Sequence, residues 1–165
     1  MPRLHHIRKN QPVLFFASEN WWFDRSRVQA HALGIPNWSA NPSIGNRMIN
    51  ARAETLTELP SFKPLVDRRR CNIPADGFYE WRKEGKHKVP MWVHMKNHKP
   101  FGLAGLWDVW RKPDGNRVES ITIITTNPNE LVRPIHNRMP VILRPDDEEQ
   151  WLDAYRTAFS KARSL

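Results

Sequence analysis

The side chains of this chain that could do chemistry fall in three short stretches. Residues 50–54, 77–81 and 135–140 each place a proton-handling or anion-binding side chain in an apolar or tightly turned setting. Carboxylates, imidazoles and guanidinium groups are the groups that acid–base catalysis and anion binding use. Together the three stretches have the composition of an active site without its nucleophile.

The context of each stretch indicates a role. In an extended strand Asn50, Arg52 and Glu54 share one face, while the alanines between them share the other. Glu80 is surrounded in sequence by aromatic residues, so we expect desolvation to raise the pKa of its carboxyl group toward a useful acid–base range. His136 lies between two prolines, which hold the backbone of its segment stiff.

The composition favours a nucleic-acid partner. The chain has 165 residues, of which 39% are hydrophobic, enough for one domain with one core over residues 1–165. Lys and Arg number 26 against 17 Asp and Glu, which favours a polyanion, although a merely basic protein is the alternative. The eight Trp residues add to this interpretation because indoles stack on unpaired bases, and we expect most of them to lie in the core.

The cysteine count and the motifs exclude several classes of protein. Cys71 is the only cysteine, so no intramolecular disulfide is expected, and because no apolar run is long enough we expect neither secretion nor membrane insertion. We therefore expect a cytoplasmic protein, nucleoid-associated when bound to DNA, with no membrane partner. His94 and His98 have the spacing of a helical metal pair but fall around a predicted strand and its turn, so we expect neither a metal site nor a cofactor.

The hydrophobic pattern predicts an α+β fold with a mostly antiparallel, strongly bent sheet or barrel and a few flanking helices. One strand is expected through Cys71 and Ile73. Seven further strands, separated by turn residues, are expected at residues 12–17, 48–54, 78–82, 91–95, 101–110, 118–126 and 139–143. Helices are expected at residues 61–70, from residue 127 onward and at residues 145–162.

Two of the expected helices have a clear apolar face. In residues 61–70 this face is Phe62, Leu65 and Val66, and residues 67–70 should be exposed. The helix at residues 145–162 begins with acidic and ends with basic residues, as the helix dipole prefers. Its apolar stripe is expected in the core and consists of Trp151, Leu152, Tyr155 and Phe159.

A cysteine-hydrolase triad of Cys71, His136 and Glu80 is one interpretation of the chemistry. The pattern favours a structural thiol instead, because Cys71 shares a strand face with Ile73 and cysteine is among the most buried residue types. The arginines at 68–70 are expected to be a solvated helix end or a phosphate contact.

Several ordered segments of the chain resemble the SOS-response-associated peptidase (SRAP) family. They are residues 42–55, 69–81, 105–107, 125–126 and 135–141, and the resemblance covers roughly residues 33–152, with residues 1–32 divergent. Family members bind single-stranded DNA and form a stable crosslink with the aldehyde of an abasic site. The resemblance implies a SRAP-like fold, abasic sites in single-stranded DNA as partner, and a self-processing peptidase or lyase-like activity. We expect a monomer.

The resemblance also implies roles for the residues in the matching motifs. In the family, residue 2 is a cysteine whose amine and thiol close a thiazolidine on the sugar aldehyde. By resemblance, Asn50 orients that cysteine, Glu80 shuttles protons, and His136 stabilises the opened sugar and its phosphate.

The same resemblance implies DNA contacts by three further residues. Arg52 and Arg138 fit phosphate contacts, and Trp38 resembles a wedge that stacks on a base. The alternatives are that Arg52 pairs with Glu54, that Asn50 caps a bulge and that Trp38 is core.

The chain departs from the family pattern at both ends. Residue 2 is Pro, the opening Met-Cys-Gly-Arg segment is absent, and a later C-terminal strand is not found. The interpretation is a shortened copy or a reading frame with the wrong ends, and we expect no stable abasic-site crosslink, although the amine of Pro2 could attack an aldehyde. The leading function is a SRAP-family abasic-site-processing protein. The alternatives are a noncovalent single-stranded nucleic-acid-binding module and a cysteine hydrolase that uses Cys71.

Overall fold

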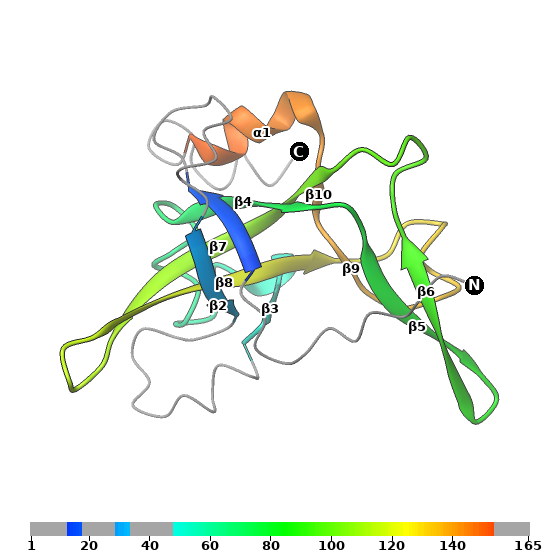
Figure 1. Ribbon diagram of the computed structural model, residues 1–165, viewed down its shortest axis with the longest axis horizontal. Helices are drawn as coiled ribbons and strands as arrows, with labels where there is room; N and C mark the ends of the chain where they lie inside the picture. Colours follow the sequence, from blue (N-terminus) through cyan, green and yellow to red (C-terminus); the bar gives the residue numbers. More distant parts are fainter. Residues whose placement is uncertain (1–12, 18–28, 34–47, 154–165) are drawn as a thin grey trace.

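The computed structural model describes residues 13–17, 29–33 and 48–153, and the side chains of residues 48–153. Half of these residues form strands, which gather into one large curled sheet and one separate hairpin (Figure 1). The large sheet contains β1 (Val13–Ala17), β2 (Gln29–Leu33), β3 (Asn50–Arg52), β4 (Arg70–Ala75), β7 (Phe101–Arg111), β8 (Arg117–Thr126), β9 (Met139–Pro140) and β10 (Ile142–Leu143). The predicted α+β fold with a strongly bent sheet is confirmed.

Five of the described strands pair in a closed circuit, which gives the sheet its barrel-like curl. The circuit runs through β7, β4, β1, β2 and β8, and β8 pairs again with β7. Among the described strands, β2 and β3 run parallel to β8, and the other pairs are antiparallel. The predicted mostly antiparallel sheet is therefore correct, and the sequence pattern did not indicate the two parallel pairings.

The β7–β8 hairpin follows from local sequence. The strand β8 is rich in Ile and Thr, whose branched side chains favour extended backbone. In the turn, Gly115 has a φ of 84°, and the carboxylate of Asp114 accepts a hydrogen bond from the backbone N–H of Asn116 at 2.9 Å. Both strands lie where the sequence predicts them.

The strands β5 (Phe78–Glu84) and β6 (His87–Val93) form a hairpin of their own. Gly85 turns the chain with a backbone φ of 60°, an angle that residues other than glycine rarely adopt. In Figure 1 this hairpin projects from the large sheet at the opposite end of the view from the β7–β8 turn. The register with β5 extends β6 back to His87 and ends it at Val93, so the predicted strand at 91–95 is shifted.

The core lies between the curled sheet and α1 (Pro145–Leu152). Residues Leu56, Phe62, Leu106, Ile124 and Trp151 belong to one buried cluster. A second cluster joins Cys71 and Ile73, which share a buried face of β4 as predicted. The indole N–H of Trp151 donates to the carbonyl of Cys71 at 2.9 Å and fastens α1 to the sheet.

The predicted helix at residues 61–70 is wrong, although its apolar face is correct. Residues 56–68 form successive turns, in which Pro60 and Pro64 supply no backbone N–H for a continuous helical ladder. Phe62, Leu65 and Val66 are nevertheless buried.

The predicted exposure of Arg70 is also wrong. Only 2% of Arg70 is exposed, and its guanidinium donates to the carbonyls of Val66 and Trp151 at 3.0 and 2.6 Å. Burial lowers the pKa of Arg70, because desolvation disfavours the charged form. This arginine therefore joins α1 to β4 and is not a solvated helix end or a phosphate contact.

Three other elements are shorter than predicted. The strand expected at 48–54 ends at Arg52, where a 3-10 turn (Ala53–Thr55) begins. The helix expected from residue 127 is instead a run of turns over residues 130–135, in which the side chain of Asn129 accepts from the N–H of Val132 at 3.0 Å. The strand at 139–143 breaks at Val141, which bonds to both neighbouring strands.

The C-terminal helix ends earlier than predicted. α1 stops at Leu152, and Asp153 has a non-helical ψ of 67°. Trp151 and Leu152 are buried as expected, whereas Tyr155 and Phe159 lie outside the described residues.

Candidate active site

Two of the three stretches meet at Glu80 and His136. Glu80 lies on β5, opposite Met91 of β6, and His136 lies in the loop between β8 and β9. The Nδ1 atom of His136 is 3.7 Å from a carboxylate oxygen of Glu80. The side chain of Glu80 is 21% exposed and that of His136 is 43% exposed, so both groups can reach a ligand from solvent.

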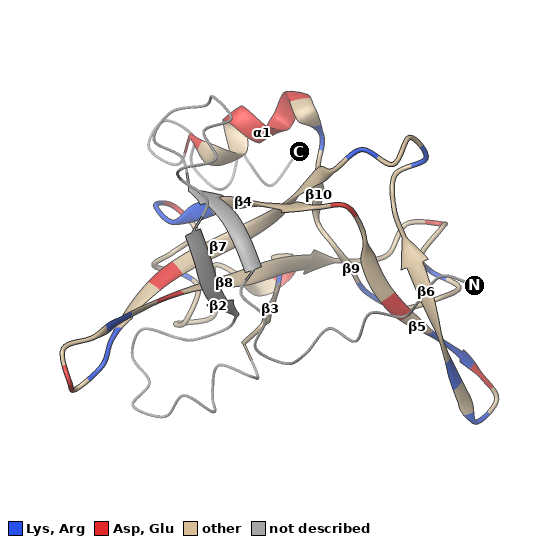
Figure 2. Ribbon diagram, in the orientation of Figure 1, with Lys and Arg blue, Asp and Glu red and all other residues tan. Residues whose placement is uncertain are grey.

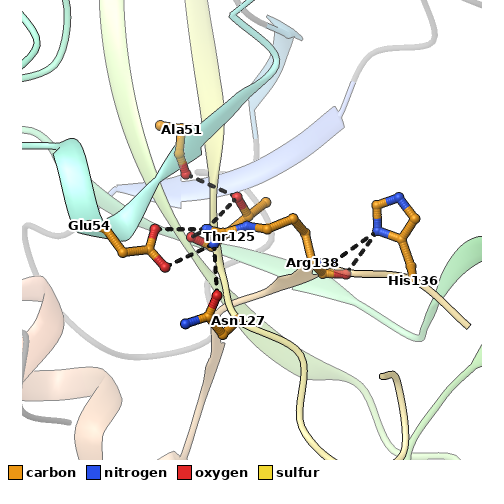
Figure 3. Close-up of polar contacts among 6 residues, drawn as sticks. All are labelled: Ala51, Glu54, Thr125, Asn127, His136 and Arg138. Atoms are coloured by element: carbon orange, nitrogen blue, oxygen red, sulfur yellow. Dashed lines mark hydrogen bonds and ion pairs between the residues drawn. The ribbon is translucent and has the colours of Figure 1, made fainter. Parts of the chain in front are cut away.

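The backbone of its own loop orients the imidazole of His136 (Figure 3). The N–H of Arg138 donates to Nδ1 at 3.2 Å, and the carbonyl of Arg138 lies 3.1 Å from the same atom. A neutral ring that accepts at Nδ1 carries its proton on Nε2, whereas a protonated ring can donate from Nδ1 to the carbonyl. Either protonation state of His136 therefore finds a backbone partner without moving the ring.

Arg138 anchors this loop to the large sheet. Its guanidinium donates to both carboxylate oxygens of Glu54 at 2.8 and 2.9 Å, to the carbonyl of Thr125 at 2.6 Å and to the side chain of Asn127 at 3.3 Å (Figure 3). The hydrogen bond from Arg138 holds the pKa of Glu54 below its usual value. Glu54 thus pairs with Arg138, and a DNA phosphate at Arg138 would share a guanidinium that already has partners.

Glu80 and His136 line an open depression of about 600 Å³. Trp81, Lys83 and Lys88 also line it, and residues 134–137 form its other wall. A carboxylate and an imidazole can pass protons to and from a bound group, and ammonium groups bind phosphate. The depression therefore suits a phosphate-bearing ligand with an acid–base reaction at one position.

Sequence reasoning missed Lys83 and Lys88, although the sequence contains a signal for them. They are direct register partners across the β5–β6 hairpin. Like charges directly opposite one another destabilise a sheet. Two lysines at equal distances from a predicted Gly turn are therefore unfavourable for the hairpin itself, and this pairing is the signal that the sequence contained.

Asn50 and Arg52 lie on β3, beside the anchored loop. Both are exposed while Ala51 between them is buried, which confirms the predicted alternation within β3, whereas Glu54, predicted on the same strand face, lies in the 3-10 turn. Arg52 is the register partner of Thr125, whose carbonyl Arg138 binds. Within the described part of the chain, the side chain of Asn50 makes no hydrogen bond to Glu80 or His136.

Trp38 lies outside the described residues, so its predicted role as a stacking wedge stays a prediction.

Cys71 does not fit the hydrolase alternative. Its side chain is fully buried in the core, and burial raises the pKa of the thiol far above its usual value. A thiol must be accessible and able to lose its proton to act as a nucleophile. The structure therefore favours the structural role of Cys71.

In the described ranges, no three His, Cys, Asp or Glu side chains gather in a way that could hold a metal ion. None of the helices in that part of the chain has the length and apolarity needed to span a membrane.

The chain is similar to proteins of known family and to solved structures. It is 53% identical over 133 residues to the abasic site processing protein YoqW of Bacillus subtilis, an alignment that covers 79% of this chain and 59% of the relative. The abasic site processing protein HMCES of Gallus gallus is 34% identical over 155 residues, with 79% of this chain and 46% of the relative covered. This chain spans about three fifths of the length of YoqW and of two further Bacillus subtilis relatives that it matches.

Solved structures support the same fold. A protein from Bacteroides thetaiotaomicron superposes with a TM-score of 0.78 at 36% identity, covering 83% of this chain and 62% of that one. A protein from Bordetella bronchiseptica superposes with a TM-score of 0.72 at 28% identity, covering 84% and 70%. The family model "SOS response associated peptidase (SRAP)" matches residues 5–165. On this evidence, the chain belongs to the SOS response associated peptidase family.

Proposed function

We propose that this chain processes abasic sites in DNA, with Glu80 and His136 as the proton-handling pair. The observation that carries the proposal is the 3.7 Å approach of the two side chains in a depression that Lys83 and Lys88 also line. The names of the relatives, which are abasic site processing proteins from bacteria and vertebrates, support the choice of substrate.

The chemistry of an abasic sugar needs such a pair. The sugar must open to its aldehyde, which moves a proton from the C1 hydroxyl to the ring oxygen, and strand cleavage by β-elimination then removes a proton from C2 as the 3′ phosphate leaves. The carboxylate of Glu80 can take the hydroxyl proton, return it to the ring oxygen and then take the C2 proton. His136 can hold the oxygen of the opened sugar through its Nε2 proton, since Nδ1 accepts from the backbone.

We infer that the DNA is single-stranded at the site, because a single strand can bring an abasic sugar into the depression without the cost of unstacking and unpairing a duplex. Arg52 is exposed on β3 and suits a phosphate contact, and Asn50 is exposed two residues earlier. Trp38 would stack on a neighbouring base. For Arg138 we propose a positioning role, because its guanidinium holds the loop of His136.

We further propose that the 165-residue polypeptide acts without forming the family's stable crosslink. A thiazolidine requires an amine and a thiol on the same residue, and the single thiol of this sequence, Cys71, is buried inside a strand. Its amine is part of a peptide bond.

The test compares oligonucleotides with and without one abasic site. Strand cleavage and denaturation-resistant adducts are measured on denaturing gels, and binding is measured by fluorescence anisotropy. We expect Glu80→Gln and His136→Ala to lower the rate of abasic-site processing by about 10²–10⁴-fold, the usual contribution of acid–base catalysis. Their affinity for undamaged DNA should change little.

The matched control is Glu84→Gln, which removes a carboxylate from the same hairpin. Glu84 is exposed and pairs with Arg82 at the far end of β5. If Glu80→Gln and Glu84→Gln process abasic DNA at the same rate, Glu80 has no catalytic role.

The second candidate is a noncovalent single-stranded nucleic-acid-binding module. The excess of 26 Lys and Arg over 17 Asp and Glu favours it. It predicts equal, salt-sensitive binding to both oligonucleotides and no change in the abasic strand. The cytoplasmic location and the monomeric state stay predictions.

A further inference from the structure

Four aromatic side chains stand in a row along the β5–β6 hairpin and the loop after it. Tyr79 and Trp92 are register partners, with ring centroids 4.6 Å apart. Trp92 and His94 stack at 6.4 Å, and His94 and His98 stack at 4.5 Å. We call Tyr79, Trp92, His94 and His98 the ring row. Other residues line the depression at Glu80 and His136.

The ring row is accessible and held in place. Trp92 is 41% exposed although it is one of the largest apolar side chains of the hairpin, and His98 is exposed as well. The indole of Trp92 lies over Gly77, so close that a Cβ atom there would be 2.4 Å from the ring. An exposed indole fixed from below can bind a flat ligand with little loss of conformational entropy.

The rings are most widely spaced at one position. The ring centroids of the two end pairs are 4.6 and 4.5 Å apart, whereas those of Trp92 and His94 are 6.4 Å apart at an interplanar angle of 27°. Trp92 therefore has a close partner in Tyr79 and a looser one in His94, and much of its indole surface is exposed to a ligand.

The charge around the row suits a polyanion. Residues 77–99 contain six Lys and Arg against two Glu. Figure 2 shows stretches of ribbon coloured for Lys and Arg at the tip of the β5–β6 hairpin and in the loop that follows β6. A ligand that offers both flat rings and negative charge is a single-stranded nucleic acid.

We propose that the ring row binds unpaired bases of the DNA strand whose abasic nucleotide lies at Glu80 and His136. One base stacks on the exposed indole of Trp92, a second stacks on the exposed ring of His98, and the lysines of the hairpin bind the phosphates. The inference rests on the proposed function for the identity of the strand, because the same hairpin carries Glu80 and the row. The competing explanation is that the rings only stabilise the hairpin.

The experiment uses two variants of the full chain and two kinds of strand. Trp92→Ala removes the central ring, and the double variant His94→Ala/His98→Asn leaves Trp92 on Tyr79. Asparagine suits position 98 because His98 has a φ of 55°. Binding is measured by anisotropy with a labelled thymidine oligonucleotide of about a dozen nucleotides, the length of an ordinary binding site. The second strand has the same number of phosphates but carries tetrahydrofuran spacers in place of bases.

We expect each variant to bind the thymidine strand about five- to a hundredfold more weakly than the wild type, as loss of base stacking does. Binding to the base-free strand should change less than twofold, because phosphate contacts are unaffected. Leu59→Ala is the control for loss of an exposed apolar side chain, since Leu59 is 43% exposed and lies outside the hairpin. If the double variant binds thymidine strands like the wild type, the row does not bind bases.

The two proposals fail in different ways. If the ring variants lose affinity for thymidine strands but Glu80→Gln does not slow abasic-site processing, the ring row binds bases and Glu80 is not catalytic. If Glu80→Gln slows processing while the ring variants bind normally, the catalytic assignment stands and the row only stabilises the hairpin. Equal weakening on the thymidine and base-free strands would also overturn the stacking role.

Discussion

Arg138 is the residue on which the position of His136 depends. Its backbone N–H bonds to the imidazole, and its guanidinium joins the loop to Glu54 and to Thr125 of β8. Its Nε atom is buried and donates to no described residue. The hydrogen bonds from its two terminal nitrogens to Glu54 and Thr125 therefore hold the loop in place. Loss of Arg138 would release the loop and not only remove a positive charge.

The ion pair of Glu54 and Arg138 makes a prediction for stability. Glu54→Gln should lower the free energy of unfolding at pH 7 by about 1 to 2 kcal/mol, the lower range for a charged hydrogen bond, because the Glu54 side chain is 38% exposed. Because the pKa of Glu54 is lowered on folding, the stabilisation is present above the unfolded value of 4.5 and is lost as the pH falls through the folded value. Urea unfolding measured from pH 7 to pH 3 should therefore show the free energy of unfolding of the wild type falling toward that of Glu54→Gln.

The matched control for that series is Glu58→Gln, which changes an exposed carboxylate just after the 3-10 turn. Its effect should be within about 0.5 kcal/mol of zero, as for most surface substitutions. A difference between wild type and Glu54→Gln that stays constant across the pH range would contradict the ionic contribution of Glu54.

At the scale of elements, β4 and β7 approach each other closely at Gly105. This glycine is the register partner of Cys71, and a Cβ atom there would lie 2.6 Å from the Cδ1 atom of Ile73 and 3.0 Å from the sulfur of Cys71. The sheet can curl tightly at this point because β7 presents no side chain at position 105, where Cys71 and Ile73 of the second buried cluster come closest to it.

Gly105→Ala should therefore destabilise the protein by about 1 to 3 kcal/mol, the usual cost of overpacking a core. The nearest clash is with the Cδ1 methyl of Ile73, so Ile73→Val, which removes that methyl, should relieve part of the cost. The free energies of unfolding of both single variants and the double variant form a cycle. Additive effects would show that the two residues do not compete for the same space.

At the scale of the whole molecule, the basic charge is distributed around two hairpins and the site between β5 and the β8–β9 loop (Figure 2). The formal charge of +9 comes from the full sequence. Such a field raises the affinity for any polyanion, so only the salt dependence separates direct phosphate contacts from the general field.

We predict that Lys83→Ala/Lys88→Ala makes binding to DNA less sensitive to salt. The plot of the logarithm of the binding constant against the logarithm of the salt concentration should have a smaller negative slope. The loss should be about 0.7 for each phosphate contact removed from a single strand. Lys112→Ala is the control, because it removes a charge at the β7–β8 turn, away from the depression at the opposite end of Figure 1. Equal slopes for the wild type and the double variant would mean that the two lysines do not contact the backbone of the DNA.

Local sequence determined much of this fold. The β7–β8 and β5–β6 hairpins, the first strand and the buried face of Cys71 and Ile73 follow from alternation and turn residues that act over a few positions. The stretches that contain Glu80 and His136 could also be picked out, because unusual neighbours mark them in the sequence. These features depend on interactions between residues close in the chain.

The tertiary structure decided the rest, because the deciding contacts join residues far apart in the chain. Arg70 is buried because α1, about 80 residues later, covers it, and its local pattern indicated a solvated end. Glu54 pairs with Arg138, 84 residues away, and not with the nearby Arg52. The 3.7 Å approach of Glu80 and His136 likewise requires the closed circuit of strands that sets the β8–β9 loop beside the hairpin. A sequence pattern reports which side chains prefer burial or water, but the partner of each depends on how the sheet closes.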